Sequence, residues 1–317
     1  MTYHPTAISN DFKNLPKLPT WVTTGRVETP ETVAFRSGAM LTVLDQLLSD
    51  PTHGVPVKLL GNRLALSAAT ATSKLEGRLS REIDIRDAFH LTPAGEARGP
   101  DGDLLAYWRE AARLRLTERE WHAGLVGSEF ETDVDGWLQS AANQSQSHGP
   151  IAGCVSVMRA VLEADDRAER IACLLGDVVL AQALNWKTVL PVTSRRLTKA
   201  MLRDLVTEGQ DGELTVQQRL LESVEDTTRL ARDLASQAAA VHAVAPKLRA
   251  NGSDAAVALF LSEDAVAPST MLSPIIQGTT IPMTGRSARR ICDRLVELGV
   301  VQELTGRPTF RLYGIAP

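Results

Sequence analysis

Residues 284–313 read T-G-R-S-A-R-R-I-C-D-R-L-V-E-L-G-V-V-Q-E-L-T-G-R-P-T-F-R-L-Y, and this stretch decides the fold that we expect at the C-terminal end of the chain. Its first half has apolar residues at helical spacing, and Ile291, Leu295 and Leu298 form a stripe that would face a core. Thr284 or Ser287 can cap the N-terminus of this helix by accepting a hydrogen bond from a free backbone N–H.

The second half of the stretch predicts a two-stranded hairpin. Gly299 suits the left-handed conformation that ends a helix, and a strand would start at Val300 and Val301. The sequence T-G-R-P at 305–308 is typical of a turn, and residues 310–313 return with the alternating character of a second strand.

Two further helices are expected before this stretch, at 254–261 and at 269–276, the second separated from the third by Gly278 and Pro282. The order of three helices and a hairpin is that of a winged helix-turn-helix. We therefore predict such a module at residues 251–317, with the third helix as recognition helix and the hairpin as wing.

The charge of this stretch points to nucleic acid. Residues 284–313 hold six Arg, two Glu, one Asp and no Lys, whereas the whole chain has a formal net charge of −4. The guanidinium group can grip phosphate or the edge of guanine. The candidate DNA-contacting residues are Arg286, Ser287, Arg289, Arg290, Arg294, Arg307 and Arg311. A winged helix that contacts only protein is the alternative for the same residues.

The composition sets limits on the rest of the chain. With 317 residues, 44% hydrophobic and only 4% aromatic, the chain can build a helical core from aliphatic and small side chains. Its mildly acidic balance argues against general coating of nucleic acid, so binding should be confined to a patch. We find no signal peptide and no apolar run long enough for a membrane span, and we expect a cytoplasmic protein without membrane contact.

Residues 1–28 read as an extended arm and residues 29–250 as an all-α body. The fold class that we predict is therefore mainly α: a multi-helix bundle followed by the winged module. Helix signals are strongest in segments that start with a cap or end at Gly or Pro. The helices expected in the body are 30–49, 57–76, 80–91 (capped by Ser80), one from about 104, 131–146, 151–164, 167–185, 194–206 (capped by Ser194) and 213–245. A loop is expected at 92–102.

The longest of these helices carries a heptad pattern of more than four repeats. The seam positions are Leu220, Val224, Thr227, Ala231, Leu234, Ala238, Val241, Ala245 and Leu248. Its partner is either another helix of the same bundle or the same helix of a second subunit. The second alternative makes the 220–248 seam a candidate homodimer interface.

The sequence offers no catalytic signature, and we predict neither an enzyme nor a cofactor or metal site. The six His are scattered without the spacing of a helical metal site, and the chain has no phosphate-binding loop. The three Cys lie in apolar helical contexts and read as core residues. Asp177 falls inside a strongly apolar run, where a buried acid needs a partner, and we expect an Arg beside it.

Two resemblances add to this interpretation. The segment 72–77, T-S-K-L-E-G, is similar to the inhibitory-helix motif of Fic-type AMP-transferring enzymes, and the wing segment resembles the C-terminal winged helix appended to many Fic proteins. The catalytic signature of that family, H-P-F-x-x-G-N-G-R, is absent, so its activity is not implied. If Glu76 acted on another protein's active site, it would have to be exposed.

A resemblance over most of the chain, from about 33 to 315, is to an alphaproteobacterial family of unknown function, DUF1403. It is carried by the segments R-L-A-L-S-A-A-T-A-T-S-K-L-E-G-R (63–78), R-D-A-F-H-L-T-P-A-G (86–95) and A-E-R-I-A-C-L-L-G-D-V-V-L-A (168–181), and by the wing. It implies a bacterial origin and no established activity.

Our functional prediction therefore depends on the wing. We expect a sequence-specific binder of double-stranded DNA, acting as a transcriptional regulator or a plasmid or mobile-element maintenance factor, with the helical body serving dimerisation, partner binding or ligand sensing. The alternatives are a protein-interaction scaffold and a catalytically degenerate Fic-like protein.

Overall fold

The computed structural model describes residues 15–23, 28–93, 95–117, 121–122, 124–127, 129–248, 251–307 and 309–316. These residues form a mainly helical structure with one small antiparallel sheet. Most of the predicted N-terminal arm, residues 1–14 and 24–27, lies outside the described residues. Among the helices that are described, none combines the length and the apolar character needed to cross a membrane.

The helices of the body follow the sequence pattern closely. In chain order they are α1 (Thr20–Thr23), α2 (Pro30–Ser49), the short η2 (Pro51–His53), α3 (Val57–Leu75), α4 (Glu82–Leu91), α5 (Gly99–Ala111), α6 (Val134–His148), α7 (Pro150–Ala164), α8 (Glu169–Ala183), η3 (Thr193–Arg196), α9 (Lys199–Thr207), α10 (Gly209–Val244) and η4 (Ala245–Lys247).

The C-terminal module, residues 251–307 and 309–316, adds fewer elements. They are α11 (Ser253–Phe260), the single π-helical turn η5 (Pro268–Leu272), α12 (Gly285–Glu297), β1 (Val301–Glu303) and β2 (Tyr313–Ile315).

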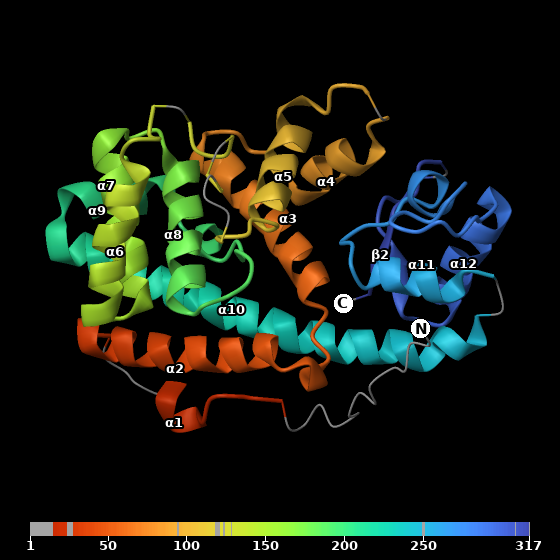
Figure 1. Cartoon of the computed structure of the whole chain (residues 1–317), viewed down its shortest axis with the longest axis horizontal. Helices are drawn as coiled ribbons and strands as arrows, with labels where there is room; N and C mark the ends of the chain where they lie inside the picture. Colours follow the sequence, from red (N-terminus) through yellow and green to blue (C-terminus); the bar gives the residue numbers. More distant parts are fainter. Residues whose placement is uncertain are drawn as a thin grey trace.

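Figure 1 shows how these elements are arranged. Helix α10 runs along most of the length of the molecule and α2 lies beside its first half, with α6, α7, α8 and α9 gathered at one end. Helices α3, α4 and α5 rise from the middle, and the C-terminal module lies at the other end, above the last turns of α10. At about 1.5 Å per residue, the 36 residues of α10 span roughly 54 Å, so this one helix reaches from end to end.

Local capping chemistry explains where several helices begin. The Thr29 hydroxyl accepts from the Thr32 backbone N–H, the Thr32 hydroxyl accepts from the Thr29 N–H at 2.8 Å, and Pro30 follows the cap. This reciprocal cap fixes the start of α2 where the sequence predicted it.

Two predicted caps were wrong. The Ser80 hydroxyl donates to Asp101 at 2.7 Å, and Arg81 takes the cap position of α4 without a side-chain bond. Ser194 lies inside η3, and Thr198 caps α9 instead. The loop predicted at 92–102 is also shorter, because α5 already begins at Gly99.

The heptad seam of α10 is buried within a single chain. Its positions from Leu220 to Val241 are all buried, and the surrounding helices are α2, α3, α7 and α9 with the turn η3. Of the two alternatives for its partner, the structure therefore has the one inside the bundle. From Leu220 to Val241 the seam offers no surface for the homodimer that we considered through residues 220–248, since these side chains are already covered, and Ala245 is half-buried.

Asp177 has a different partner from the one that we expected. Its Oδ1 accepts hydrogen bonds from the backbone N–H groups of Val192 and Thr193, both at 2.8 Å, while Oδ2 has no hydrogen-bond partner among the described residues. The prediction of an Arg was wrong because the N–H groups at the start of η3 fill that place. Burial raises the pKa of Asp177 to about 8, although the two backbone bonds oppose the shift.

This raised pKa predicts a pH dependence of stability. The unfolded chain releases the Asp177 proton near pH 4 and the folded chain near pH 8, so stability is lost as the pH rises through that window. Between pH 6 and pH 9 we expect the free energy of unfolding of the wild type, measured with urea, to fall by roughly 2 to 3 kcal/mol. The variant Asp177→Asn should not show this fall. The exposed Asp135→Asn serves as the control and should follow the wild type. A variant Asp177→Asn with the same pH profile as the wild type would contradict the assignment.

Candidate nucleic-acid interface

The C-terminal module is built around α12. Strands β1 and β2 pair antiparallel with Val301 opposite Ile315, and Val266, which precedes η5, exchanges both backbone hydrogen bonds with Tyr313. Thr284 caps α12 through its side chain, and Gly299 adopts the left-handed conformation that ends it, as predicted.

Two details of the module differ from the sequence prediction. The helix expected at 269–276 is only the turn η5, because the bridge at Val266 on one side and the bridge between Ile275 and Pro282 on the other leave little room. The returning strand starts at Tyr313 instead of Phe310, since Phe310 has a φ of +55° that no extended strand allows.

Helix α12 has one apolar and one charged face. Ala288, Ile291, Cys292 and Leu295 are buried against η5 and β1. Arg286, Arg289, Arg290 and Arg294 are all exposed on the remaining surface. The predicted orientation of the helix is confirmed, and its basic side chains face outward from the module.

The first half of this charged face carries positive charge without a balancing carboxylate. No acidic group of the described residues lies within ion-pair distance of Arg286, Arg289 or Arg290. Ser287, beside them, accepts a hydrogen bond on its hydroxyl from Thr284 at 3.0 Å and supports the cap. The N-terminal half of α12 is therefore a compact, exposed cluster of three free guanidinium groups.

The second half of α12 is closer to neutral. Arg294 pairs with Glu297 at 2.9 Å.

Arg311 is exposed and donates to the Arg307 carbonyl at 3.1 Å. A hydrogen bond with Tyr313, helped by the negative charges of Glu303 and Asp293, raises the pKa of Arg311. Arg311 therefore lies on the hairpin and is under the influence of the acids Glu303 and Asp293.

Arg307 contacts the helical body. Its guanidinium lies 3.2 Å from the Asp87 carboxylate of α4, which Arg86 also contacts at 2.8 Å. Arg86 in turn donates to the Leu304 carbonyl at 3.0 Å. The turn that carries Arg307 is therefore held against α4, and only part of that side chain is open to solvent.

A buried ionic cluster fixes the module to the body. Arg109, at the end of α5, is 4% exposed and contacts both Glu263 and Asp264, which follow α11 and are equally buried. His90 Nε2 of α4 lies 3.4 Å from Asp264 Oδ1, and Lys58 lies 3.8 Å from Glu263. Three helices of the body thus supply two cations, Arg109 and Lys58, and the His90 ring to two adjacent acids of the module.

The pKa of Asp264 records how strongly this cluster favours the ionised acid. Burial alone would raise it, but the hydrogen bond and charge of His90 and the charge of Arg109 lower the pKa to about 2. Because the folded value lies below the ordinary value of 3.8, this contribution to stability is present above that pH. It is lost as the pH falls toward 2.

Two hydrogen bonds to backbone carbonyls complete the junction. Asn62 of α3 donates to the Ser262 carbonyl at 2.7 Å, and Arg63 donates to the Ile315 carbonyl at 2.8 Å. Together with the ionic cluster, these bonds hold the module in one orientation, with the apolar face of α12 turned inward and its free Arg cluster turned out.

The similarity to a known protein family extends over most of the chain. A family model described as "Protein of unknown function (DUF1403)" matches residues 6–315. The chain belongs to this family. No curated protein matches the sequence.

In this DUF1403 protein the segment 63–78 contains most of α3, which ends at Leu75, and Glu76 is the capping residue that follows. The Glu76 carboxylate accepts hydrogen bonds from Arg170 at 2.6 Å and from Arg78 at 2.7 Å, so it is engaged within its own chain. Arg170 also stacks over the Tyr107 ring. Two of the segments that carry the family resemblance, one in α3 and one in α8, are therefore joined by this ion pair.

The described residues of the DUF1403 protein contain no group of three or more His, Cys, Asp or Glu side chains placed to hold a metal ion. The groups that fix the module were missed at the sequence level. Arg109 lies 155 residues from Asp264 and 154 from Glu263, and no local pattern joins residues so far apart. The one local signal in the sequence is the short polar run S-E-D at 262–264 between two apolar segments.

The ionic cluster predicts a large effect of Arg109→Ala. The substitution leaves two carboxylates buried without their main cation, and breaking a buried pair in this way costs about 3–5 kcal/mol. We expect urea unfolding to show that loss, and hydrogen exchange to be faster in α11 and α12. Arg113→Ala removes an exposed Arg four residues further along and should behave as wild type. Equal stability of both variants would show that the cluster does not hold the module.

Proposed function

We propose that this protein binds double-stranded DNA through its C-terminal module, with α12 as recognition helix, and acts as a transcriptional regulator or a maintenance factor of a plasmid or mobile element. The observation that carries the proposal is the cluster of Arg286, Arg289 and Arg290 on the exposed N-terminal half of α12. In helix-turn-helix proteins the N-terminal residues of the recognition helix make the base contacts.

The order of elements supports the proposal. Helix α11, the extended residue Val266, the turn η5, helix α12 and the hairpin β1–β2 follow the order of a winged helix. In this interpretation Val266 supplies the third, shortest strand of the wing sheet. The helix that usually precedes the recognition helix is reduced here to η5, which is a departure from the pattern.

The charges of the module also favour DNA as the partner over other acidic surfaces. A free guanidinium can make a bidentate contact to guanine, and phosphate contacts add affinity that falls with salt. Since Arg307 is paired with Asp87 and Arg311 lies among acids, we assign the main contact to Arg286, Arg289 and Arg290. The hairpin residues are assigned a supporting role.

The test is binding to random genomic fragments at two salt concentrations. We expect wild type to enrich particular sequences and to bind more weakly at higher salt, and Arg286→Ala/Arg290→Ala to bind about a hundredfold more weakly. Arg167→Ala/Arg203→Ala removes the same charge from exposed positions in the α8–α9 part of the body and should bind as wild type. Failure of the folded wild type to bind at low salt would contradict the proposal, as would equal loss in both double variants.

A protein-interaction scaffold is the second candidate, favoured by three apolar side chains exposed on the same module, one of which is Val296 of α12 at 39%. Phe310 is 72% exposed and Ile275 is 51% exposed. Phe310→Ser should abolish capture of a protein partner under this alternative and should leave DNA enrichment unchanged under the first. We do not propose an inhibitor that acts through Glu76, because two Arg of the same chain already hold its carboxylate.

A further inference from the structure

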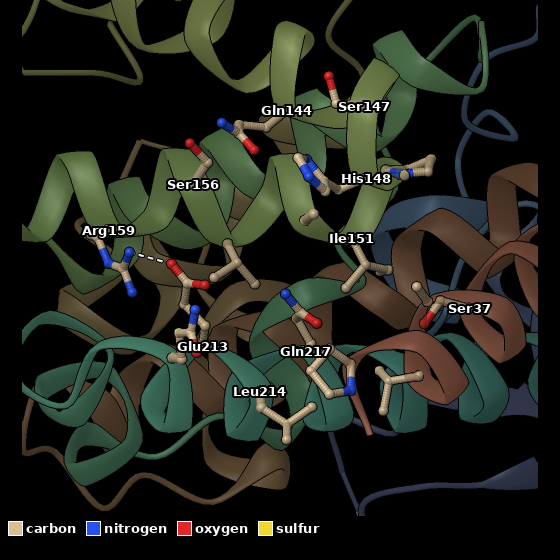
Figure 2. A pocket seen from close by; sticks show the side chains of 18 of the residues that line it. Ser37, Gln144, Ser147, His148, Ile151, Ser156, Arg159, Glu213, Leu214 and Gln217 are labelled. Carbon is tan, nitrogen blue, oxygen red and sulfur yellow. Dashed lines mark hydrogen bonds and ion pairs between the residues drawn. The ribbon is translucent and has the colours of Figure 1, made fainter. Parts of the chain in front are cut away.

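A groove of about 980 Å³ lies at the end of the body far from the C-terminal module. Figure 2 shows its setting: Gln144, Ser147 and His148 lie along one edge, Leu214 and Gln217 along the other, and Ser37 closes one end. The walls come from α2, α7, the last turn of α6 and the first turns of α10. Its volume is at the upper end of the range for small-molecule sites.

Gly38 in the groove wall has no explanation in the packing of the chain. It occupies the interior of α2, where Gly is less favourable than Ala by roughly 0.5–1 kcal/mol. An added Cβ would meet no atom within 4 Å, so no described neighbour requires a glycine there. The missing side chain widens the groove, which is what close approach of a ligand to the helix would need.

Ser37, the adjacent residue, gives a second and independent observation. It is 2% exposed, and its hydroxyl has no hydrogen-bond partner among the described residues. A buried polar group normally has a partner, and one left without it calls for an explanation. Ser37 is one of the residues that line the groove, so a ligand at that end of the groove could supply the missing hydrogen bond.

The lining sets the class of ligand. Its apolar part is aliphatic, from Val33, Ile151, Val155 and Leu214, and no Phe, Tyr or Trp is among the described residues that line it. Its polar lining includes His148 and several Ser and Gln side chains, and the amides both donate and accept hydrogen bonds. An aliphatic chain with an amide-like head matches both parts.

The charges of the groove argue for an uncharged head. Arg159 is already used, since it pairs with Glu213 and donates to the carbonyls of Leu205 at 3.1 Å and Gly209 at 3.3 Å. Glu31 and Glu163 lie on the exposed rim, where they disfavour an anion and contribute little to holding a cation.

We propose that the groove between α2, α7 and α10 is a binding site for an uncharged aliphatic amide, with the chain over the aliphatic floor and the head hydrogen-bonded to Ser37. The site lies on α10, which runs to the C-terminal module, and it is independent of the Arg cluster of α12.

The test compares three probes with the same chain and different heads: octanamide, octanoate and octylamine, titrated calorimetrically against the full chain. We expect octanamide to bind most tightly. Ser37→Ala should weaken it about fivefold, the worth of one hydrogen bond. Gly38→Leu should weaken it at least tenfold by filling the groove, without unfolding α2, because an added Cβ meets no atom within 4 Å and Leu favours helix more than Gly.

The matched control is Gly136→Leu in α6. Gly136 also lies inside a helix and an added Cβ there meets no atom within 4 Å, but it does not line the groove. It should bind octanamide as wild type. Preference for octanoate or octylamine, equal binding to Gly38→Leu, or no binding of octanamide would each overturn the proposal. None of these results depends on DNA binding, so the two proposals can fail separately.

Discussion

The buried contact of Arg109 with Glu263 and Asp264 determines how the rest of the molecule is organised. Two adjacent acids of the C-terminal module enter the body, and burial of two carboxylates is tolerated only when cations and donors meet them. Arg109, His90 and Lys58 provide that compensation from three different helices. Because each partner has a fixed place, the module can dock in one orientation only, and the orientation of α12 follows from it.

This constraint also explains why the Arg residues of the module have different roles. Those of the hairpin lie near α4 or near acids, and Arg307 forms an ion pair with Asp87. Those on the first half of α12 are exposed and have no acidic partner among the described residues. Docking of the module therefore gives the Arg residues two roles: some hold the module in place, and those on the first half of α12 remain available to a partner. The long helix α10 connects this end of the molecule to the groove at the other.

The sequence predicted what local chemistry controls. The start of α2 at Thr29-Pro30 and the end of α12 at Gly299 depend on residues within a few positions, and both were placed correctly; of the two candidate caps of α12, Thr284 is the one used. The apolar period of α10 predicted its buried seam, though the period alone could not say whether the partner was in the same chain. The wrong predictions concern side chains whose hydrogen-bond partner lies far away in the sequence. Ser80 donates its hydroxyl to Asp101 and does not cap a helix, and Asp177 accepts from the N–H groups of Val192 and Thr193 where an Arg was expected. For the candidate interface, helical spacing was enough to put the α12 Arg residues on one exposed face. The pairing of Arg307 with Asp87 joins distant parts of the chain and left no local signal.

The central claim is that the body presents the Arg-bearing half of α12 outward to DNA. Hydrogen–deuterium exchange of the full chain, with and without a duplex carrying an enriched sequence, tests it most directly. The account predicts slower exchange in residues 285–290 and in the hairpin, with the walls of the groove unchanged. Protection confined to the helical body, with α12 exchanging as in the free protein, would contradict it.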